Sequence, residues 1–232
     1  FVLVAISFSQ ARADVLNGSF ENFFNDWTSV GPNTASTGVA GVSPTDGNRM
    51  AYLSNNSFLG LAVHDAILSS DPNVGLSAGD LTNTILALYP NATQGGTLFQ
   101  SILPLGNVGE ICSIEFDWNF LTNEGQNNDF GFFALASGGS LTHFGSLDVA
   151  DATLGASSPY AHQSGWQTQT ISGLAGGLNY SLIFGVFQSG PNSIDSALLV
   201  DNIRCECVPE PSSALLMGLA SLSATGFRRR RS

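Results

Sequence analysis

The sequence predicts an all-β protein, an antiparallel β-sandwich with one short helix, and the spacing of its apolar residues supports this. Between residues 111 and 121, Ile114, Phe116, Trp118 and Phe120 alternate with polar residues, which is the period of a half-buried strand. Further segments rich in β-branched and aromatic residues are separated by Gly, Asn, Ser and Pro clusters, at spacings that suit a sandwich. These strand candidates are Arg49–Ser54, Thr97–Leu103, Phe130–Ala136, Trp166–Ile171, Asn179–Gln188 and Ala197–Arg204.

Two elements depart from the half-buried pattern. The run YSLIFGVF, residues 180–187, is apolar on both faces, so we expect a central strand that is covered on both sides. Ser77 and Asp80 have the spacing of a helix start. Leu81, Ile85 and Leu88 then follow at helical spacing before a proline. We therefore predict one short helix here.

The charge of the chain excludes two classes of protein. Its 232 residues carry seven arginines, no lysine and eighteen acidic residues, a net charge of -11. Outside the C-terminal cluster only Arg12, Arg49 and Arg204 remain, too few to neutralise the phosphates of a nucleic acid. A hydrophobic content of 43% with 11% charged residues is the opposite of a disordered chain. The length predicts one domain, which we place at residues 14–208.

The first residues have the pattern of an export signal. Residues 1–13 read FVLVAISFSQARA, and Ala11 and Ala13 are small residues at the positions that signal peptidase accepts. We interpret the segment as the end of a truncated signal peptide, with a mature chain that begins near Asp14. A buried N-terminal strand is the alternative.

The C-terminal segment has a different composition from the body. Residues 212–227 contain no charged side chain, and sixteen helical residues reach about 24 Å, short of the roughly 30 Å hydrocarbon core of a bilayer. We expect a short hydrophobic helix that is a marginal membrane span. The arginines behind it would stay on the cytoplasmic side, which places the body outside.

Residues 209–232 begin with Pro209-Glu210-Pro211, continue through this apolar segment and end with a cluster of four arginines, and in this order they resemble a PEP-CTERM sorting signal of Gram-negative bacteria. The resemblance implies recognition by an exosortase, an inner-membrane intermediate, removal of the tail and delivery to the cell surface or extracellular matrix. A plain C-terminal membrane anchor is the alternative. The residues that carry the resemblance are Pro209, Glu210 and Pro211, the apolar segment, and then Arg228, Arg229, Arg230 and Arg231.

Three segments of the body stand out: LNGSFE from residue 16, with Trp27 after it, DGN from residue 46 and LVDNI from residue 199. By these segments the body is similar to jelly-roll modules related to carbohydrate-binding domains. The stretch FDWNFLTNEGQNNDF is also similar to β-sandwich bodies found ahead of PEP-CTERM tails. The jelly-roll resemblance implies a structural calcium ion that joins the first and last strands, with Glu21, Asp46 and Asp201 as its ligands.

A second calcium candidate comes from the residues themselves. Calcium takes six to eight oxygen ligands, and a strand followed by its loop can present them together. Acidic and amide side chains gather in this way on one strand face and the turn after it. A solvated acidic face is the alternative to both calcium sites. The second set consists of Glu115, Asp117, Asn119, Glu124 and Asp129, with Asn123 and Asn128 nearby.

The three cysteines fit an exported protein, because thiols are oxidised outside the cytoplasm. Cys112 opens one strand candidate and Cys205 or Cys207 closes another, so we predict a disulfide between Cys112 and Cys205, or Cys207. Metal binding by Cys205-Glu206-Cys207 is the alternative. It falls short of a zinc signature because a second ligand pair is missing from the motif.

We assign no catalytic residue. Gly75-Leu76-Ser77-Ala78-Gly79 matches the nucleophile-elbow pattern, but Ser77 follows Asp71-Pro72-Asn73 rather than a hydrophobic strand. The histidines available as a base are His64, His143 and His162. Carboxyl pairs for glycoside hydrolysis can be drawn from Glu115, Asp117 and Glu124.

Binding is the function class that the sequence favours. An aromatic ring stacks on the apolar face of a sugar when it is exposed. Trp118 alternates with core residues, so we expect it to be buried, whereas Tyr160 and Trp166 lie in a Gly/Ser/Pro-rich stretch and are our glycan-binding candidates. We predict an exported, non-enzymatic protein that binds glycan or exopolysaccharide and holds structural calcium. A secreted polysaccharide-acting hydrolase is the alternative.

Overall fold

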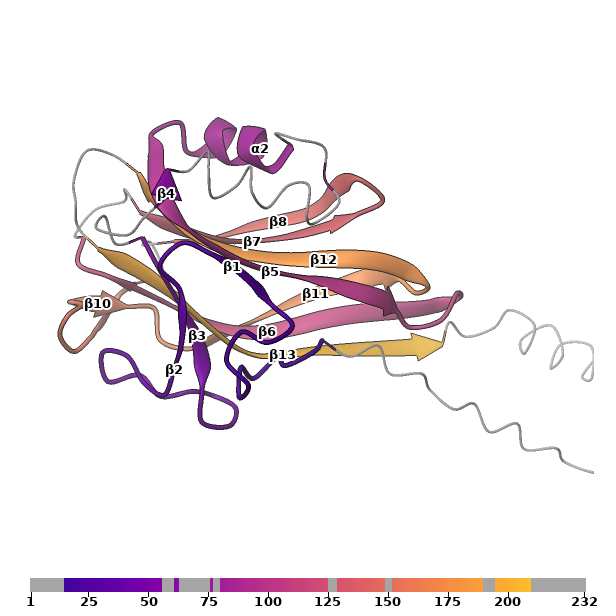
Figure 1. The fold of residues 1–232 in the computed structure, drawn as a ribbon, viewed down its shortest axis with the longest axis horizontal. Helices are drawn as coiled ribbons and strands as arrows, with labels where there is room; N and C mark the ends of the chain where they lie inside the picture. The colour runs from indigo at the N-terminus through magenta and orange to yellow at the C-terminus, as the bar shows by residue number, and fades with distance from the viewer. Residues whose placement is uncertain are drawn as a thin grey trace, which may run out of the picture.

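The computed structural model describes residues 15–55, 61–62, 76, 80–124, 129–148, 152–189 and 195–209 and shows two antiparallel β-sheets packed face to face (Figure 1). Several predicted features lie outside these residues: the signal segment 1–13, the sorting tail from Glu210 onward, Ser77 of the nucleophile-elbow pattern, His64 and Asn128. No helix in the described part of the chain is long and apolar enough to cross a membrane.

We name the first sheet sheet A. Its hydrogen-bonded order is β1 (Thr28–Val30), β5 (Ala92–Leu105), β12 (Leu178–Ser189), β7 (Phe130–Ser137) and β8 (Ser140–Asp148), and β4 (Leu61–Ala62) also pairs with β5. Sheet B has the order β2 (Thr34–Ser36), β3 (Met50–Ser54), β13 (Ser196–Pro209), β6 (Glu110–Thr122), β10 (His162–Gln163) and β9 (Leu154–Gly155), and β11 (Gln167–Ala175) also pairs with β6. Non-consecutive strands lie side by side in both sheets, so most of the pairing is long-range in sequence.

The main core lies between the two sheets, and the period of two in β6 accounts for one side of it. Ile114, Phe116, Trp118 and Phe120 are all buried in this core, as the alternation predicted. Phe184 of β12 meets Phe116 edge-to-face, with ring centroids 4.9 Å apart. The sandwich fold and the burial of Trp118 are therefore confirmed.

Sheet A is buried on its outer face as well. The central strand β12 turns Phe184 toward the main core and Ile183 and Phe187 toward a second apolar cluster. Helix α2 (Asp80–Leu88) covers that cluster with Leu81 and Ile85, and Figure 1 shows the helix above the sheet. This confirms both the predicted helix and the prediction that YSLIFGVF is a central strand covered on two sides.

Three strand partners in sheet A place a phenylalanine ring directly opposite a glycine. The cross-strand pairs are Phe187 with Gly95, Phe132 with Gly185 and Phe133 with Gly145. A Cβ atom at any of these glycines would collide with the ring of its partner. The rings therefore lie flat over the neighbouring backbone, where only glycine leaves room for them.

The outer face of sheet B is covered over part of its area by loops. Met50, Leu121 and Leu199 form a third apolar cluster there, against which the chain around Val42 and Tyr160 packs. The rest of this face is polar and carries Glu115, whose carboxylate forms an ion pair with Arg204.

The strands that the sequence did not predict are mostly short or peripheral. They are β1, β2, β4, β8, β9 and β10. Of these only β8 is long, and its sequence SLTHFGSLD mixes polar residues and glycine. An outer strand needs one covered face and one neighbour, so its apolar pattern is weaker than that of β6 or β12.

A disulfide joins Cys112 of β6 to Cys207 of β13, where the two residues are direct cross-strand partners. The structure thus selects Cys207 over Cys205, which lies buried in the main core. Because Cys207 is in the disulfide, the Cys205-Glu206-Cys207 metal alternative is wrong. The bond links residues 95 positions apart and closes about half of the described body into one loop.

Removal of this disulfide is expected to destabilise the fold. Cys112→Ser combined with Cys207→Ser should lower the free energy of unfolding by about 2–5 kcal/mol, because a long loop gains entropy in the unfolded chain. Urea unfolding followed by tryptophan fluorescence measures the change. Parent protein treated with reductant should match the double variant, and a reductant-insensitive midpoint would contradict the prediction.

Candidate functional site

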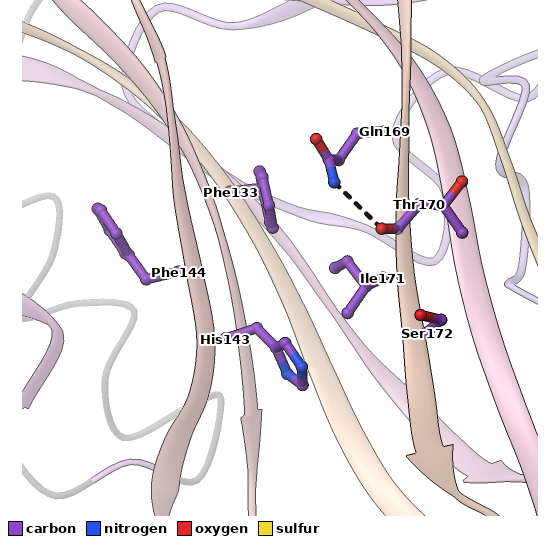
Figure 2. A pocket seen from close by; sticks show the side chains of 7 residues that line it. All are labelled: Phe133, His143, Phe144, Gln169, Thr170, Ile171 and Ser172. Carbon is purple, nitrogen blue, oxygen red and sulfur yellow. Dashed lines mark hydrogen bonds between the residues drawn. The ribbon is translucent and has the colours of Figure 1, made fainter.

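A groove opens where the two sheets part, between β8 of sheet A and β11 of sheet B. In the described part of the chain, β8 pairs with β7 and β11 pairs with β6, so both are outer strands of their sheets. The groove has a volume of about 280 Å³. It is lined by Phe133, His143, Phe144, Gln169, Thr170, Ile171 and Ser172 (Figure 2).

The apolar floor of the groove is the edge of the main core. Phe133 lies over Gly145 of β8 and meets Phe116 edge-to-face at 5.3 Å between ring centroids. Ile171, only 4% exposed, continues this surface from β11. Both side chains are fixed by core packing, so the floor is formed before any ligand arrives.

The polar walls are supplied by side chains that face inward from the two outer strands. His143 pairs across the strands with the core residue Leu135, and Gln169 pairs with the core residue Phe116. Figure 2 shows the His143 ring pointing across the groove toward β11, while Phe144 points to the other side of β8. The Gln169 amide donates to the Thr170 carbonyl oxygen at 3.1 Å.

The groove therefore combines an aromatic and aliphatic floor with an imidazole, an amide and the Ser172 hydroxyl, whereas the Thr170 hydroxyl donates to Glu115 on the outer face of sheet B. Hydrogen-bonding groups beside a rigid apolar surface suit a ligand with hydroxyls on its rim and carbon–hydrogen faces, and a saccharide is such a ligand. The volume of about 280 Å³ suits contact with one or two sugar units of a glycan.

The structure places the two aromatic glycan-binding candidates against sheet B, away from this groove. Tyr160 is only 4% exposed and its hydroxyl lies 2.7 Å from that of Tyr52. The expectation that Tyr160 is on the surface is therefore wrong, because the loop that carries it folds back to cover sheet B. Trp166 is half-buried, and its indole N–H donates to the Ser43 carbonyl oxygen at 2.9 Å.

The calcium ligands implied by the jelly-roll resemblance lie around one turn, residues 45–49. Asp201 accepts hydrogen bonds from the backbone N–H of Thr45 and Asp46, at 2.7 and 2.9 Å. Glu21 accepts from the backbone N–H of Asn48 and Arg49, at 2.5 and 2.8 Å, and these bonds lower its pKa. The carboxylates thus hold the turn by its N–H groups, and Asp46 is exposed.

The second calcium set is divided between separate places. Asp117 accepts from Thr168 and Asn202 on the outer face of sheet B, at 2.6 and 2.9 Å. Asn119 bonds Gln163 and Ser164, also on that sheet. Glu124 and Asp129 instead lie buried in the chain between β6 and β7.

As arranged here, neither set fits a metal centre: the described residues contain no group of three or more His, Cys, Asp or Glu side chains placed to hold a metal ion. Calcium binding stays a prediction. Thermal melts with and without a calcium chelator test it. If calcium is bound, removing it with the chelator should lower the midpoint of thermal unfolding. An unchanged midpoint would show that the carboxylates only hold the backbone of the turn.

A buried polar network that the sequence analysis missed joins the two sheets at one end. Asp129 accepts from Asn55 of the β3 end at 2.7 Å and from the N–H of Ser189 at the β12 end, at 3.3 Å. Asn55 in turn accepts from the N–H of Ser196, where β13 begins, at 2.7 Å. Sequence reasoning singled out Asp129 only as a metal ligand, because the partners come from strands far apart in the chain.

The β-sandwich body is similar in fold to solved structures of other proteins. The chain is similar to a carbohydrate-binding module, TmCBM61, in complex with β-1,4-galactotriose, at 11% identity and a TM-score of 0.45, covering 83% of this chain and 96% of that one. It is also similar to the K1 cleaved adhesin domain of Lys-gingipain from Porphyromonas gingivalis W83, at 13% identity and a TM-score of 0.43, covering 83% and 96%. The chain is likewise similar to CBM28, a carbohydrate-binding module specific for non-crystalline cellulose, at 13% identity and a TM-score of 0.42. The match covers 83% of this chain and 93% of that one. These likenesses concern the β-sandwich fold alone.

The sorting signal is the more specific finding. Residues 208–231 match the PEP-CTERM protein-sorting motif, so the predicted resemblance of the tail is confirmed. The motif implies export, surface association and processing by an exosortase. No curated protein sequence matches the chain.

Two buried carboxyl groups determine how the stability of the fold should depend on pH. Burial raises the pKa of Asp129 to about 6, against hydrogen bonds from Ser196 and Asn55 that act to lower it. Burial likewise raises the pKa of Asp201 to about 6, against backbone N–H donors that act to lower it. The ordinary pKa of an aspartate carboxyl group is 3.8. Between about pH 4 and pH 6 the folded state therefore binds more protons than the unfolded chain, and the free energy of unfolding falls as pH rises.

Asp129→Asn should flatten this fall, because the amide cannot ionise. Relative to the parent, the variant should gain about 2–3 kcal/mol in unfolding free energy between pH 4 and pH 7. Urea unfolding at a series of pH values, with chelator present, measures the gain. Asp26→Asn, at an exposed carboxyl, is the matched control. Parallel curves for parent and Asp129→Asn would contradict the prediction.

Proposed function

We propose that this chain is an exported cell-surface or extracellular-matrix protein whose β-sandwich body binds a glycan without chemical conversion. The PEP-CTERM motif supports the destination. The groove between β8 and β11 supports the binding, and its combination of a fixed Phe133 floor with the His143 and Gln169 side chains is the observation that carries the proposal.

The groups in the groove favour binding over hydrolysis. Glycoside hydrolases use a pair of carboxyl groups that flank the scissile bond, whereas this groove offers an imidazole and an amide, which recognise hydroxyls by hydrogen bonds. Exopolysaccharide around the producing cell is the ligand class we propose, because an exported surface protein meets it first. The body from residue 14 to residue 208 holds seventeen acidic residues and two arginines, so a neutral glycan fits it better than an acidic one.

Glycan binding is expected to depend on the two inward-facing polar side chains. His143→Ala and Gln169→Ala should each weaken binding by about tenfold, which corresponds to one lost hydrogen bond. Affinity electrophoresis through gels that contain neutral polysaccharides, including the exopolysaccharide of the producing bacterium, measures the retardation. His162→Ala removes an exposed histidine of β10 outside the groove and should leave binding unchanged. Equal behaviour of all three variants would place any binding elsewhere.

We further propose that the chain passes through an inner-membrane stage, at which signal peptidase removes residues 1–13 and an exosortase removes the tail. Intact-mass analysis of the exported protein should give a chain that begins near Asp14 and ends near Pro211. A membrane-bound form that retains Arg228 to Arg231 would favour a plain anchor and contradict the processing.

A further inference from the structure

The end of the sandwich at which β13 ends carries several exposed apolar side chains. Figure 1 shows the end of β13, the turn between β5 and β6 and the turn between β11 and β12 at this one end of the molecule. Among the described residues, eight large hydrophobic side chains are exposed, and four of them lie here. They are Val108 at 90% exposure, Val208 at 59%, Leu178 at 49% and Ile111 at 41%, and we call them the end patch.

The four residues are brought together by strand pairing and by the turns. Val208 and Ile111 are direct cross-strand partners in β13 and β6. Val108 packs so closely on Gly177 that a Cβ atom there would collide with it, and Leu178 follows directly. Single exposed hydrophobic residues are normal on a protein surface, whereas two such pairs at one end of the body indicate a site of interaction.

The turn that carries Val108 leaves its apolar side chain at the tip. Glu110 accepts hydrogen bonds from the backbone and side-chain nitrogens of Asn107, at 2.8 and 3.1 Å, so its carboxylate is engaged inside the turn. Turn tips usually carry Gly, Asn, Asp or Ser. A valine at 90% exposure at such a position is therefore unusual, since folding of the body gives it nothing to bury against.

The chain beyond the patch determines what can cover it. The strand β13 ends at Pro209, and the uncharged segment of the tail begins at Ser212. Three extended residues span at most about 11 Å. If residues 212–227 enter a bilayer, the end of β13 at Pro209 is held within about that distance of the lipid surface, and the end patch lies at the same end of the sandwich (Figure 1).

We infer that the end patch rests on the surface of the lipid bilayer while the sorting tail is still attached. This inference depends on the membrane stage of the proposed function. The patch would fix the orientation of the body on the membrane, with the processing site at Pro209 to Pro211 between the body and the lipid. Once the tail is removed, four modest side chains are too small an anchor, and the body is released.

The test uses the full chain mixed with phosphatidylcholine vesicles whose acyl chains carry bromine, which quenches nearby tryptophan. Val108→Trp places a reporter in the end patch. Leu154→Trp is the matched control, because Leu154 is 52% exposed in β9, next to β10 at the other end of the sandwich (Figure 1). The introduced tryptophan at position 108 should lose most of its fluorescence, and that at position 154 should lose almost none. In a Leu178→Trp chain, adding Val108→Asp should reduce quenching severalfold.

The possible outcomes test the contact of the end patch with lipid separately from the membrane stage of the proposed function. Flotation of the chain with the vesicles together with quenching confined to position 108 supports the inference. Flotation with equal quenching at both positions, or with quenching at neither, overturns it and leaves the membrane stage intact. A chain that does not float with the vesicles overturns both, while glycan binding by the groove would be unaffected.

Discussion

The packing of phenylalanine rings over glycines in sheet A is the constraint on which the remaining architecture depends. Phe187, Phe132 and Phe133 each lie over a glycine on the adjacent strand, and a Cβ atom at any of these glycines would collide with the ring. Phe187 and Phe132 make the outer face of sheet A apolar, so it needs the cover that α2 provides. Phe133 turns the other way, into the main core, and ends as the floor of the groove. The groove is thus a continuation of the same packing at the open edge of the sandwich.

The acidic side chains of the body are held mainly by neutral donors. With two arginines in the body, most carboxylates have no cation to pair with. Glu21, Glu110 and Asp201 accept backbone N–H groups of turns, and Asp129 accepts the Asn55 amide between the two sheets. Hydrogen bonds from N–H groups favour the charged form of a carboxylate, whereas burial disfavours it. The hydrogen bonds prevail at the half-buried Glu21 and Glu110, whose pKa is lowered, and burial prevails at Asp129 and Asp201, whose pKa is raised. The acidic side chains of the body therefore stabilise turns as well as making the surface negative.

The sequence predicted the strands and the helix whose apolar spacing follows from burial. It missed the elements that depend on pairing between segments distant in the chain. β6 and β12 were predicted because one or both faces are apolar, and α2 because of its helical spacing. β8 was missed, since an outer strand with glycine and polar residues has no clear period. The groove follows from β8 and β11 being outer strands of facing sheets, which no local pattern encodes. For the same reason Tyr160 was misplaced, because the cover of sheet B by its loop depends on contacts distant in the chain.

The sorting motif overlaps the last described residues of strand β13. The strand β13 stays in register with β6 as far as Pro209, opposite Glu110, and the disulfide at Cys207 lies two residues earlier. A protease needs an extended segment that is not already paired in a sheet, so residues up to Pro209 are protected by their hydrogen bonds. The sorting motif begins at residue 208 and overlaps this last pair. In the proposed processing, a cut near Pro211 would leave the β13–β6 pairing and its disulfide in place.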